Sequence, residues 1–338
     1  MLGLRARRTL HCLAVWPLLQ ACVHPPEPVA RPRESAVVFE ETCDGSGAIA
    51  LSDRLVVVAS DEDNVLRTYD VERGGRPLAS TDMSSALDLP LKGKARPTAP
   101  EMDLEAATRI GDRAYWLTSH GRSPGGKVRP ERHRLFATHT STAGVSLAGR
   151  PYDHLLADML ADPALASFQL DQAAKLPPKA PGGLNIEGLT ATPTGELLIA
   201  FRNPIPDGLA LLVPLLNPTD ILEGAEGMKA RVGPPILLDL GGYGVRSLSW
   251  WRGRYLIMAG HYASGRRSRL YEWSGHGQPR PISIDLEDLN AEGFFTPEKR
   301  PEILILSDDG ERIVDGVACK DLRDTARKTF RGLWVRPP

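Results

Sequence analysis

The chain has 338 residues, of which 42% are hydrophobic and 25% are charged. These values are typical of a globular protein with enough apolar material for a substantial core. The 41 Lys and Arg residues nearly balance the 42 Asp and Glu residues. This balance excludes an overall electrostatic attraction to nucleic acid or to an anionic membrane, so we expect no nucleic-acid partner.

The first 21 residues have the features of a signal peptide. A basic region that ends at Arg8 precedes an apolar stretch from Leu10 to Leu19, which is too short to span a bilayer as a helix. The stretch ends in LQAC, which resembles the lipobox of bacterial lipoproteins, whose cysteine is lipidated and becomes the N-terminus. We therefore predict a lipoprotein signal peptide over 1–21 and lipidation of Cys22. A plain secretory signal with an incidental cysteine is the alternative.

The residues after Cys22 bear on the membrane that holds the anchor. Val23 stands where an aspartate would resemble an inner-membrane retention signal. We therefore expect a lipid-anchored protein of the cell envelope, attached to the outer membrane and facing the periplasm, with the lipid as its one membrane contact. Residues 22–35 are rich in proline and poor in hydrophobic residues, which predicts a semi-extended tether.

The four cysteines suggest one disulfide bond. Cys12 lies in the predicted signal peptide and Cys22 carries the predicted lipid, which leaves Cys43 and Cys319 in the folded part. An even pair in an oxidising compartment predicts a Cys43–Cys319 disulfide. Two buried free thiols are the alternative.

A self-similar pattern recurs five times after the tether. Each copy has a short strand that opens with a small or acidic dipeptide, a turn, and a strongly apolar strand that ends in polar residues. The copies begin at Gly47, Leu104, Ile186, Arg246 and Ala291. Strands of period two with Gly, Asn and Asp turns indicate antiparallel sheets, and repeats of roughly 40 to 60 residues indicate propeller blades. We predict an all-β fold, a single five-bladed β-propeller over 36–338, with six blades as the alternative.

Three segments fall outside the regular pattern. The fifth copy lacks a strand, and AVVFEE from Ala36 is expected to complete it, which would close the ring between the two ends of the domain. Residues 152–175 have helical apolar spacing and predict a helical excursion between the second and third blades. Residues 320–329 predict a short surface helix within the last blade.

Several long strings resemble the bacterial domain-of-unknown-function family 3616. They include DEDNVLRTYD, MDLEAATRIGDRAYWLTSHGRS, LNIEGLTATPTGELLIAFRNPI and LLDLGGYGVRSLSWW, and the resemblance runs from about residue 45 to 310. It implies a propeller-like fold and no settled activity. The shorter strings LNIEG and LNAEG also resemble phytase-like and esterase-like propellers, which is a weaker similarity.

The repeat alignment places three glutamates at equivalent positions, namely Glu105, Glu187 and Glu292. Ser247 takes this place in the fourth copy. In a propeller these residues gather at one mouth of the central channel, where like charges raise each other's pKa or recruit a cation. A Ca²⁺ ion would suit them because it accepts several oxygen ligands in irregular geometry. A purely structural role, capping strands or pairing with arginines, is the alternative.

The ends of the second strands supply further candidate residues at the same mouth. Arginine and asparagine side chains suit anion binding, and histidines suit proton transfer. The candidate ligand-binding residues are Arg122, Arg202, Asn203 and Arg246, and the candidate catalytic residues are His120 and His261. Pairing of Arg202 with Glu187, and of Arg246 with Glu292, would make this ring inert. The acidic run over 61–64 is interpreted as a turn with solvated charge rather than a calcium loop.

Two functions are consistent with these patterns. The first is a periplasm-facing binding or interaction module that holds a small anionic ligand or another envelope protein at the channel mouth, with Ca²⁺ as the one cofactor considered. The second is a metal-dependent phosphoesterase, for which a carboxylate ring with a cation, flanked by Arg and His, is suited. We rank the binding module first, because propellers host many functions, and we expect a monomer.

Overall fold

The structure of the protein is a computed structural model. Its main elements are five four-stranded antiparallel sheets. The structure describes residues 36–93, 98–142, 144–263, 268–286 and 289–338. The predicted signal peptide, the tether and the lipidation site Cys22 lie outside these residues. Residues Ser35–Pro338 form one compact unit. Among the described residues, no helix is long and apolar enough to cross a membrane.

Four of the sheets are each formed by consecutive strands. The first contains β2 (Gly47–Ala50), β3 (Leu55–Ala59), β4 (Val65–Asp70) and β5 (Ala79–Asp82). The second contains β6 (Leu104–Ile110), β7 (Arg113–Thr118), β8 (Leu135–Ser141) and β9 (Gly144–Tyr152). The third contains β10 (Asn185–Ala191), β11 (Leu197–Asn203), β12 (Ala210–Leu215) and β13 (Ile236–Leu238). The fourth contains β14 (Gly244–Trp251), β15 (Arg254–Gly260), β16 (Arg269–Trp273) and β17 (Arg280–Ile282).

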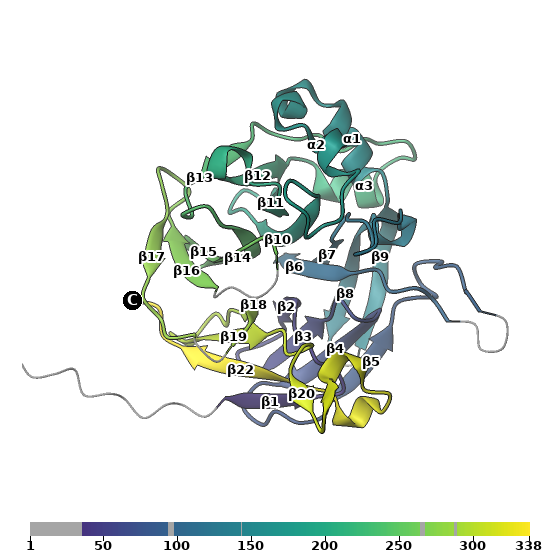
Figure 1. Cartoon of the computed structure of the whole chain (residues 1–338), viewed down its shortest axis with the longest axis vertical. Coiled ribbons are helices and arrows are strands. Elements are labelled where there is room, and N and C mark those ends of the chain that lie inside the picture. The colour runs from purple at the N-terminus through teal and green to yellow at the C-terminus, as the bar shows by residue number, and fades with distance from the viewer. Residues whose placement is uncertain (1–35, 94–97, 143, 264–267, 287–288) are drawn as a thin grey trace, which may run out of the picture. The chain divides into compact units, whose positions relative to one another are not determined.

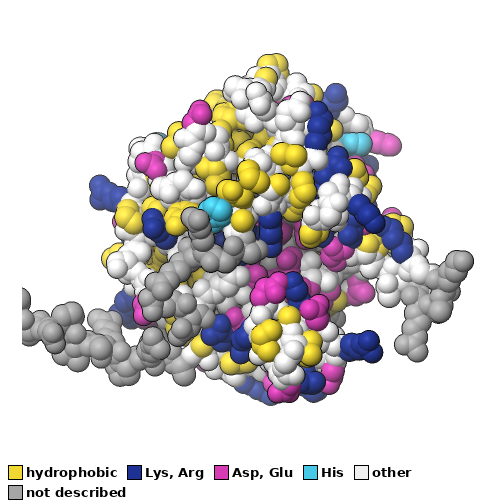
Figure 2. All heavy atoms as spheres, in the orientation of Figure 1, with side chains coloured by type: hydrophobic (Ala, Val, Ile, Leu, Met, Phe, Trp, Pro, Cys, Tyr) yellow, Lys and Arg dark blue, Asp and Glu magenta, His cyan; other side chains and the backbone are white. Residues whose placement is uncertain are grey.

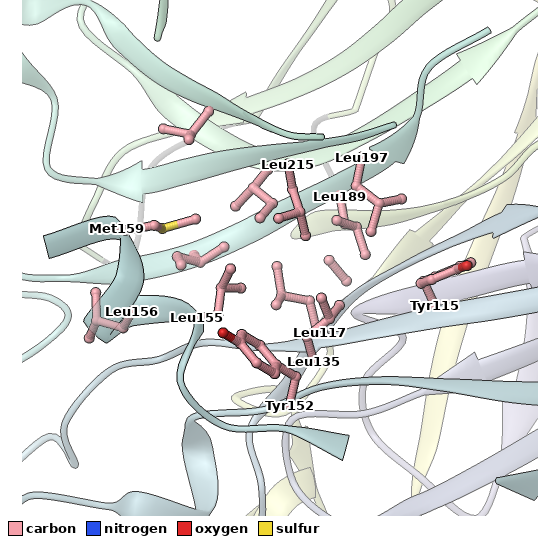
Figure 3. Packing of buried hydrophobic residues seen from close by; sticks show 14 of the residues in the cluster. Tyr115, Leu117, Leu135, Tyr152, Leu155, Leu156, Met159, Leu189, Leu197 and Leu215 are labelled. Carbon is pink, nitrogen blue, oxygen red and sulfur yellow. The ribbon is translucent and has the colours of Figure 1, made fainter. Parts of the chain in front are cut away.

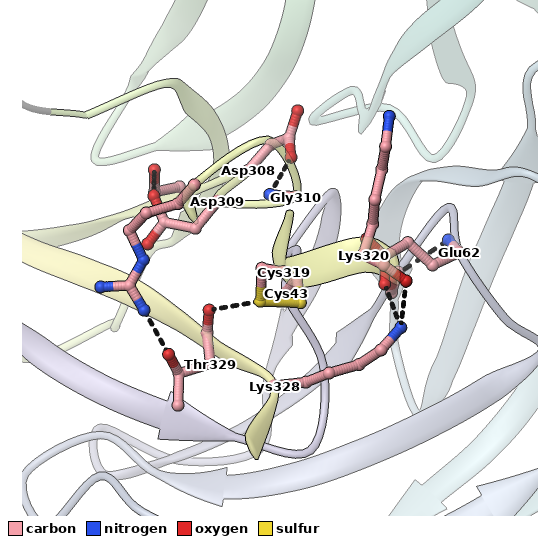
Figure 4. The surroundings of a disulfide bond; sticks show 12 residues. Cys43, Glu62, Asp308, Asp309, Gly310, Cys319, Lys320, Lys328 and Thr329 are labelled. Atoms are coloured by element: carbon pink, nitrogen blue, oxygen red, sulfur yellow. Dashed lines mark hydrogen bonds and ion pairs between the residues drawn. A yellow bond between two sulfur atoms is a disulfide. The ribbon is translucent and has the colours of Figure 1, made fainter. Parts of the chain in front are cut away.

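The fifth sheet joins the two ends of the domain. Its strand order is β1-β22-β19-β18, with the bounds β1 (Val37–Glu40), β18 (Ala291–Phe295), β19 (Ile303–Ser307) and β22 (Thr329–Val335). The segment AVVFEE therefore completes the last blade, as predicted. Cys43 and Cys319 form the predicted disulfide beside this closure, with a Cα–Cα distance of 5.9 Å (Figure 4).

The innermost strands of neighbouring blades contact one another around the whole ring. β2 contacts β6, and the contacts continue through β10, β14 and β18 back to β2. Figure 1 shows these five strands around a common centre. The prediction of a five-bladed propeller is confirmed, and six blades are not observed. Because the innermost strands all run the same way along the axis, their first residues meet at one mouth of the channel.

The helical excursion lies between blades two and three, as predicted. It contains α1 (Leu155–Ala161), the 3₁₀ helix η2 (Pro163–Phe168) and α2 (Leu170–Ala173). The buried faces of these helices pack with side chains from both blades, as Figure 3 shows for Leu155 and Met159 beside Leu135 and Leu215. The repeat pattern did not predict α3 (Pro218–Glu223), which follows β12. Two short 3₁₀ helices, η1 (Pro130–Arg132) and η3 (Pro206–Gly208), follow β7 and β11.

The prediction of a helix over 320–329 is wrong. This region contains two 3₁₀ turns, η4 (Cys319–Asp321) and η5 (Thr325–Arg327), after a small hairpin of β20 (Ile313–Val314) and β21 (Val317–Ala318). Leu322 is the one large apolar residue of the segment, so a helix there would have no apolar face to bury. The disulfide at Cys319 and the bond from the Lys328 ammonium to Glu62, 3.1 Å long, tie the segment to the first blade instead (Figure 4).

Candidate functional site

A β-bulge at the start of four innermost strands positions the candidate site. Ladder pairing skips one residue in each strand, and the skipped residues are Glu105 in β6, Glu187 in β10, Arg246 in β14 and Glu292 in β18. A bulged residue is left out of the ladder, which re-aims its side chain. The prediction of Ser247 at this position is wrong, because Ser247 pairs with Met258 and the bulge falls on the residue before it.

The three glutamates converge, as the repeat alignment predicts. One carboxylate oxygen from each of Glu105, Glu187 and Glu292 lies within 4.8 Å of the other two. All three side chains are buried, with relative exposures of 6%, 2% and 5%. Figure 2 shows acidic side chains near the centre of this face. The structure therefore brings residues of three blades into one cluster of buried carboxylates.

Two of the three glutamates have arginine partners. Arg202 Nη1 lies 2.6 Å from Glu187 Oε1, and Arg246 Nη2 lies 2.8 Å from Glu292 Oε2. Arg246 also donates to Asn290 Oδ1 at 2.6 Å. These are the two pairings that a purely structural ring would have. They bind the guanidinium groups of Arg202 and Arg246 to acceptors within the protein. The carboxylates in turn raise the pKa of Arg246 despite its burial.

Glu105 differs from the other two. Its carboxylate has no hydrogen-bond or ion-pair partner among the residues that the structure describes. Burial, followed by repulsion from Glu187 and Asp103, raises the pKa of Glu105 well above its ordinary value. A buried carboxylate in this setting is stable only if it gains a proton or a cation.

Four aspartates extend the carboxylate cluster on either side. Asp61 and Asp103 form a second group with Glu105, and Asp44 and Asp308 form a third group with Glu292, each with ligand oxygens within 4.8 Å of one another. Burial raises the pKa of Asp61 well above its ordinary value, with repulsion from Asp103 as the next cause. Among the residues that the structure describes, Asp103 is the one of the four with an arginine partner, Arg132, at 2.7 Å.

The interpretation of 61–64 as a turn with solvated charge is wrong, although the segment is a turn. Asp61 belongs to the carboxylate cluster, while Asp63 pairs with Arg67 at 2.6 Å. Asn64 is buried and accepts a bond from Met102 N–H at 2.8 Å. These polar side chains therefore contact residues from outside the turn, and the sequence of the turn alone does not reveal those contacts.

Asp44 and Asp308 were missed in the sequence. Asp308 directly follows β19, at the place that Arg202 holds near the end of β11, so the repeat alignment contained the signal for it. Asp44 lies in the irregular segment between β1 and β2, where no repeat or strand pattern marks it. The site is thus larger than the ring of three glutamates.

Two candidate ligand-binding residues hold neighbouring loops in place. Arg122 donates to the carbonyl oxygens of Ala174 at 2.8 Å and Gly126 at 3.0 Å. Asn203 donates to the carbonyl oxygens of Pro178 at 2.9 Å and Ala180 at 2.7 Å. The structure does not bring these two side chains into the carboxylate cluster.

The two histidines have different surroundings. His120 is 1% exposed, and its Nδ1 lies 2.8 Å from Thr118 O while its Nε2 has no partner in the described structure. Burial lowers the pKa of His120 to about 3, so its ring is neutral at physiological pH. His261 is partly exposed, and its Nδ1 accepts a bond from Ala263 N–H at 3.1 Å.

A cavity of about 1170 Å³ lies at the opposite end of the axis. It is lined by the residues that end the innermost strands, such as Ala50, Ile110, Ala191 and Trp251. None of the carboxylates of the cluster is among its lining residues. The large cavity and the charged cluster are therefore separate features of the channel.

Comparison with known proteins gives a family match for one segment of the chain. Residues 122–288 match the model described as "Protein of unknown function (DUF3616)". This segment of the chain is similar to the DUF3616 family. The resemblance is confirmed, over a shorter range than the expected 45 to 310. The DUF3616 segment contains Glu187, Arg202 and Arg246 but neither Glu105 nor Glu292. The weaker resemblance to phytase-like propellers stays a prediction.

Solved structures match the chain at low similarity. Glutaminyl cyclase of Myxococcus xanthus has 11% identity and a TM-score of 0.46, and the match covers 91% of this chain and 97% of that one. Virginiamycin B lyase of Staphylococcus aureus has 8% identity and a TM-score of 0.43, with coverage of 89% and 99%. These values carry no argument about the activity of this protein. No curated protein matches the chain.

Proposed function

We propose that the protein is a calcium-binding β-propeller module of the bacterial cell envelope, held at the outer membrane by lipid on Cys22 and facing the periplasm. The bound ion would occupy the channel mouth where the innermost strands begin. The observation that carries this proposal is Glu105, a buried carboxylate without a partner among the described residues, between two groups of further carboxylates. Its neighbours are Asp61 and Asp103 on one side and Glu187 and Glu292 on the other.

Oxygen spacing supports Ca²⁺ as the ion. Calcium binds carboxylate oxygens at about 2.3–2.6 Å, so two of its ligands lie at most about 5 Å apart. The oxygens of each group lie within 4.8 Å of one another. The donor set consists of carboxylates and contains neither cysteine nor histidine, which favours a hard cation over zinc.

A purely structural role accounts for Glu187 and Glu292 but leaves Glu105 unexplained. Arg202 and Arg246 neutralise the first two, whereas no arginine reaches the third within the described structure. Since these arginines are already paired, an anionic ligand would bind at this mouth through the cation. The module would then present the ion to a small ligand or to another envelope protein.

The phosphoesterase alternative stays a prediction that no observation favours. A general acid must hold a proton near neutral pH, and the low pKa of His120 does not allow this. The side chains of Arg122 and Asn203 donate to backbone carbonyl oxygens of neighbouring loops instead of facing the channel mouth. We therefore place binding ahead of hydrolysis.

A thermal-unfolding experiment on the purified full-length protein tests the calcium site. We expect a higher Tm with Ca²⁺ than with EDTA, because a ligand that binds only the folded state stabilises it. Glu105→Gln should reduce the difference without lowering the Tm in EDTA, since the neutral amide removes a calcium ligand and also removes repulsion. Glu298→Gln, at an exposed glutamate of the opposite end, should behave like the wild type. Equal wild-type Tm values in Ca²⁺ and EDTA would refute the proposal.

A further inference from the structure

Asp44 is a buried carboxylate that is only half satisfied. The residue is 1% exposed. Its Oδ2 accepts bonds from Ser46 Oγ at 2.5 Å and from Asp61 N–H at 3.2 Å. Its Oδ1 is buried and has no hydrogen-bond partner in the described part of the chain. Because an unmatched buried oxygen is costly, each such atom in a native structure calls for a proton, a water or an ion.

Two other carboxylates lie beside Asp44. Oxygens of Asp44, Glu292 and Asp308 are all within 4.8 Å of one another. Asp308 is held in place by bonds from Gly310 N–H and from Asn290 Nδ2, both 2.8 Å long. The three residues come from the segment before β2, from β18 and from the end of β19, so they meet at the seam between the first and last blades.

Electrostatics distinguish this group from an ordinary ion-paired cluster. Burial and repulsion from Glu292 raise the pKa of Asp308 to about 6. Burial, followed by repulsion from Asp61, raises the pKa of Asp44 well above its ordinary value. Glu292 alone has an arginine partner within the described structure, Arg246 at 2.8 Å. A divalent cation would satisfy the other two carboxylates together.

The charge of the whole cluster points to more than one ion. The three overlapping groups contain seven different carboxylates. Three guanidinium groups pair with them among the described residues, Arg132, Arg202 and Arg246. Seven negative charges against three positive ones leave an excess of four, which two divalent cations would neutralise.

We propose a second divalent-cation site, held by Asp44, Asp308 and Glu292, next to the site at Glu105. The proposal deepens the proposed function and rests on it. Both sites contain carboxylates alone, so both would take Ca²⁺. The second ion would link the segment that follows Cys43 to the strands of the last blade, and so it would reinforce the closure that the Cys43–Cys319 disulfide makes.

Calcium stoichiometry tests the second site. The purified full-length protein is equilibrated with Ca²⁺ at slightly alkaline pH and dialysed, and bound calcium per chain is measured by mass spectrometry. We expect two ions in the wild type and one in Asp44→Asn or in Glu105→Gln. Asp53→Asn changes a half-buried aspartate at the opposite end and should keep both ions. If Asp44→Asn does not fold, Asp308→Asn replaces it with the same expectation.

The outcomes separate the two proposals. One ion in the wild type that survives Asp44→Asn and is lost in Glu105→Gln would overturn the second site and leave the proposed function standing. One ion that either substitution removes would show a single shared site, which also overturns the second. No bound ion in the wild type would overturn both proposals.

Discussion

Arg246 in β14 and Glu187 in β10 occupy equivalent bulges of neighbouring blades, with Arg246 Nε 3.9 Å from Glu187 Oε2. The fourth blade thus supplies a positive charge at the position where three other blades supply a negative one. The guanidinium also lies 2.8 Å from Glu292 Oε2, so one arginine serves two carboxylates. The arginine at this position lowers the electrostatic cost of burying the glutamates of those three blades.

Removal of this charge should be costly. Arg246→Met would leave Glu292 unpaired and Glu187 with less compensation, and breaking a buried pair in this way costs about 3–5 kcal/mol. We expect a loss of this size in the free energy of unfolding, measured by denaturant titration in EDTA. Arg323→Met, at an exposed arginine, should change it by less than about 0.5 kcal/mol. Equal stability of the two variants would contradict the role of Arg246.

Calcium stabilisation should grow as the pH rises. Folding raises the pKa of Asp308 from 3.8 to about 6, so the ion-free folded state binds protons that calcium must displace. Proton binding by Asp308 therefore stabilises the ion-free folded state fully below about pH 4. This stabilisation is lost as the pH rises through about 6. Hence the Tm difference between Ca²⁺ and EDTA should be small at pH 5 and larger at pH 8.

The difference between the two conditions is the informative quantity. His120 has the opposite effect, because burial lowers its pKa from 6.5 to about 3, and its contribution to stability is lost as the pH falls below 6.5. This contribution is the same with and without calcium, so it cancels in the difference. A Tm difference independent of pH would show that protons and calcium do not compete.

The opposite end of the channel is held by hydrogen bonds between blades. Thr190 Oγ1 in β10 accepts a bond from Trp250 N–H in β14 at 2.8 Å. Thr190→Val should cost about 1–3 kcal/mol in the free energy of unfolding, because it leaves that N–H unmatched. Calcium binding should not change, since the threonine is remote from the carboxylates. Thr194→Val, at an exposed turn, is the matched control, and an equal effect would argue against the inter-blade bond.

The lipid anchor can be tested in cells. Cys22→Ala in the full-length protein should abolish labelling by a radioactive fatty acid and release the protein from the membrane fraction. Cys12→Ala, in the predicted signal peptide, should leave both unchanged. Retention of the label in Cys22→Ala would exclude the lipobox cysteine as the attachment site.

The repeat pattern was sufficient to predict the propeller, its closure by the first strand and the convergence of Glu105, Glu187 and Glu292. These features follow from strand period and from equivalent positions in the repeats. The placement of Arg246 at the bulge was not predictable from residue type. The bulge shifts the strand pairing by one residue, and the fourth blade has an arginine where three other blades have a glutamate. Asp44 was beyond prediction because it precedes the first repeat and reaches the cluster through tertiary packing.

The pairing of β1 with β22 has a consequence for how the domain reaches its native state. The ring contains a strand from each end of the domain, so the last blade cannot be completed before the final strand has been synthesised. The disulfide behind this strand pair joins cysteines 276 positions apart, which makes it a late contact of high sequence separation. The first four blades can assemble earlier as an open arc, whose exposed edge strands need protection from aggregation until the circle closes.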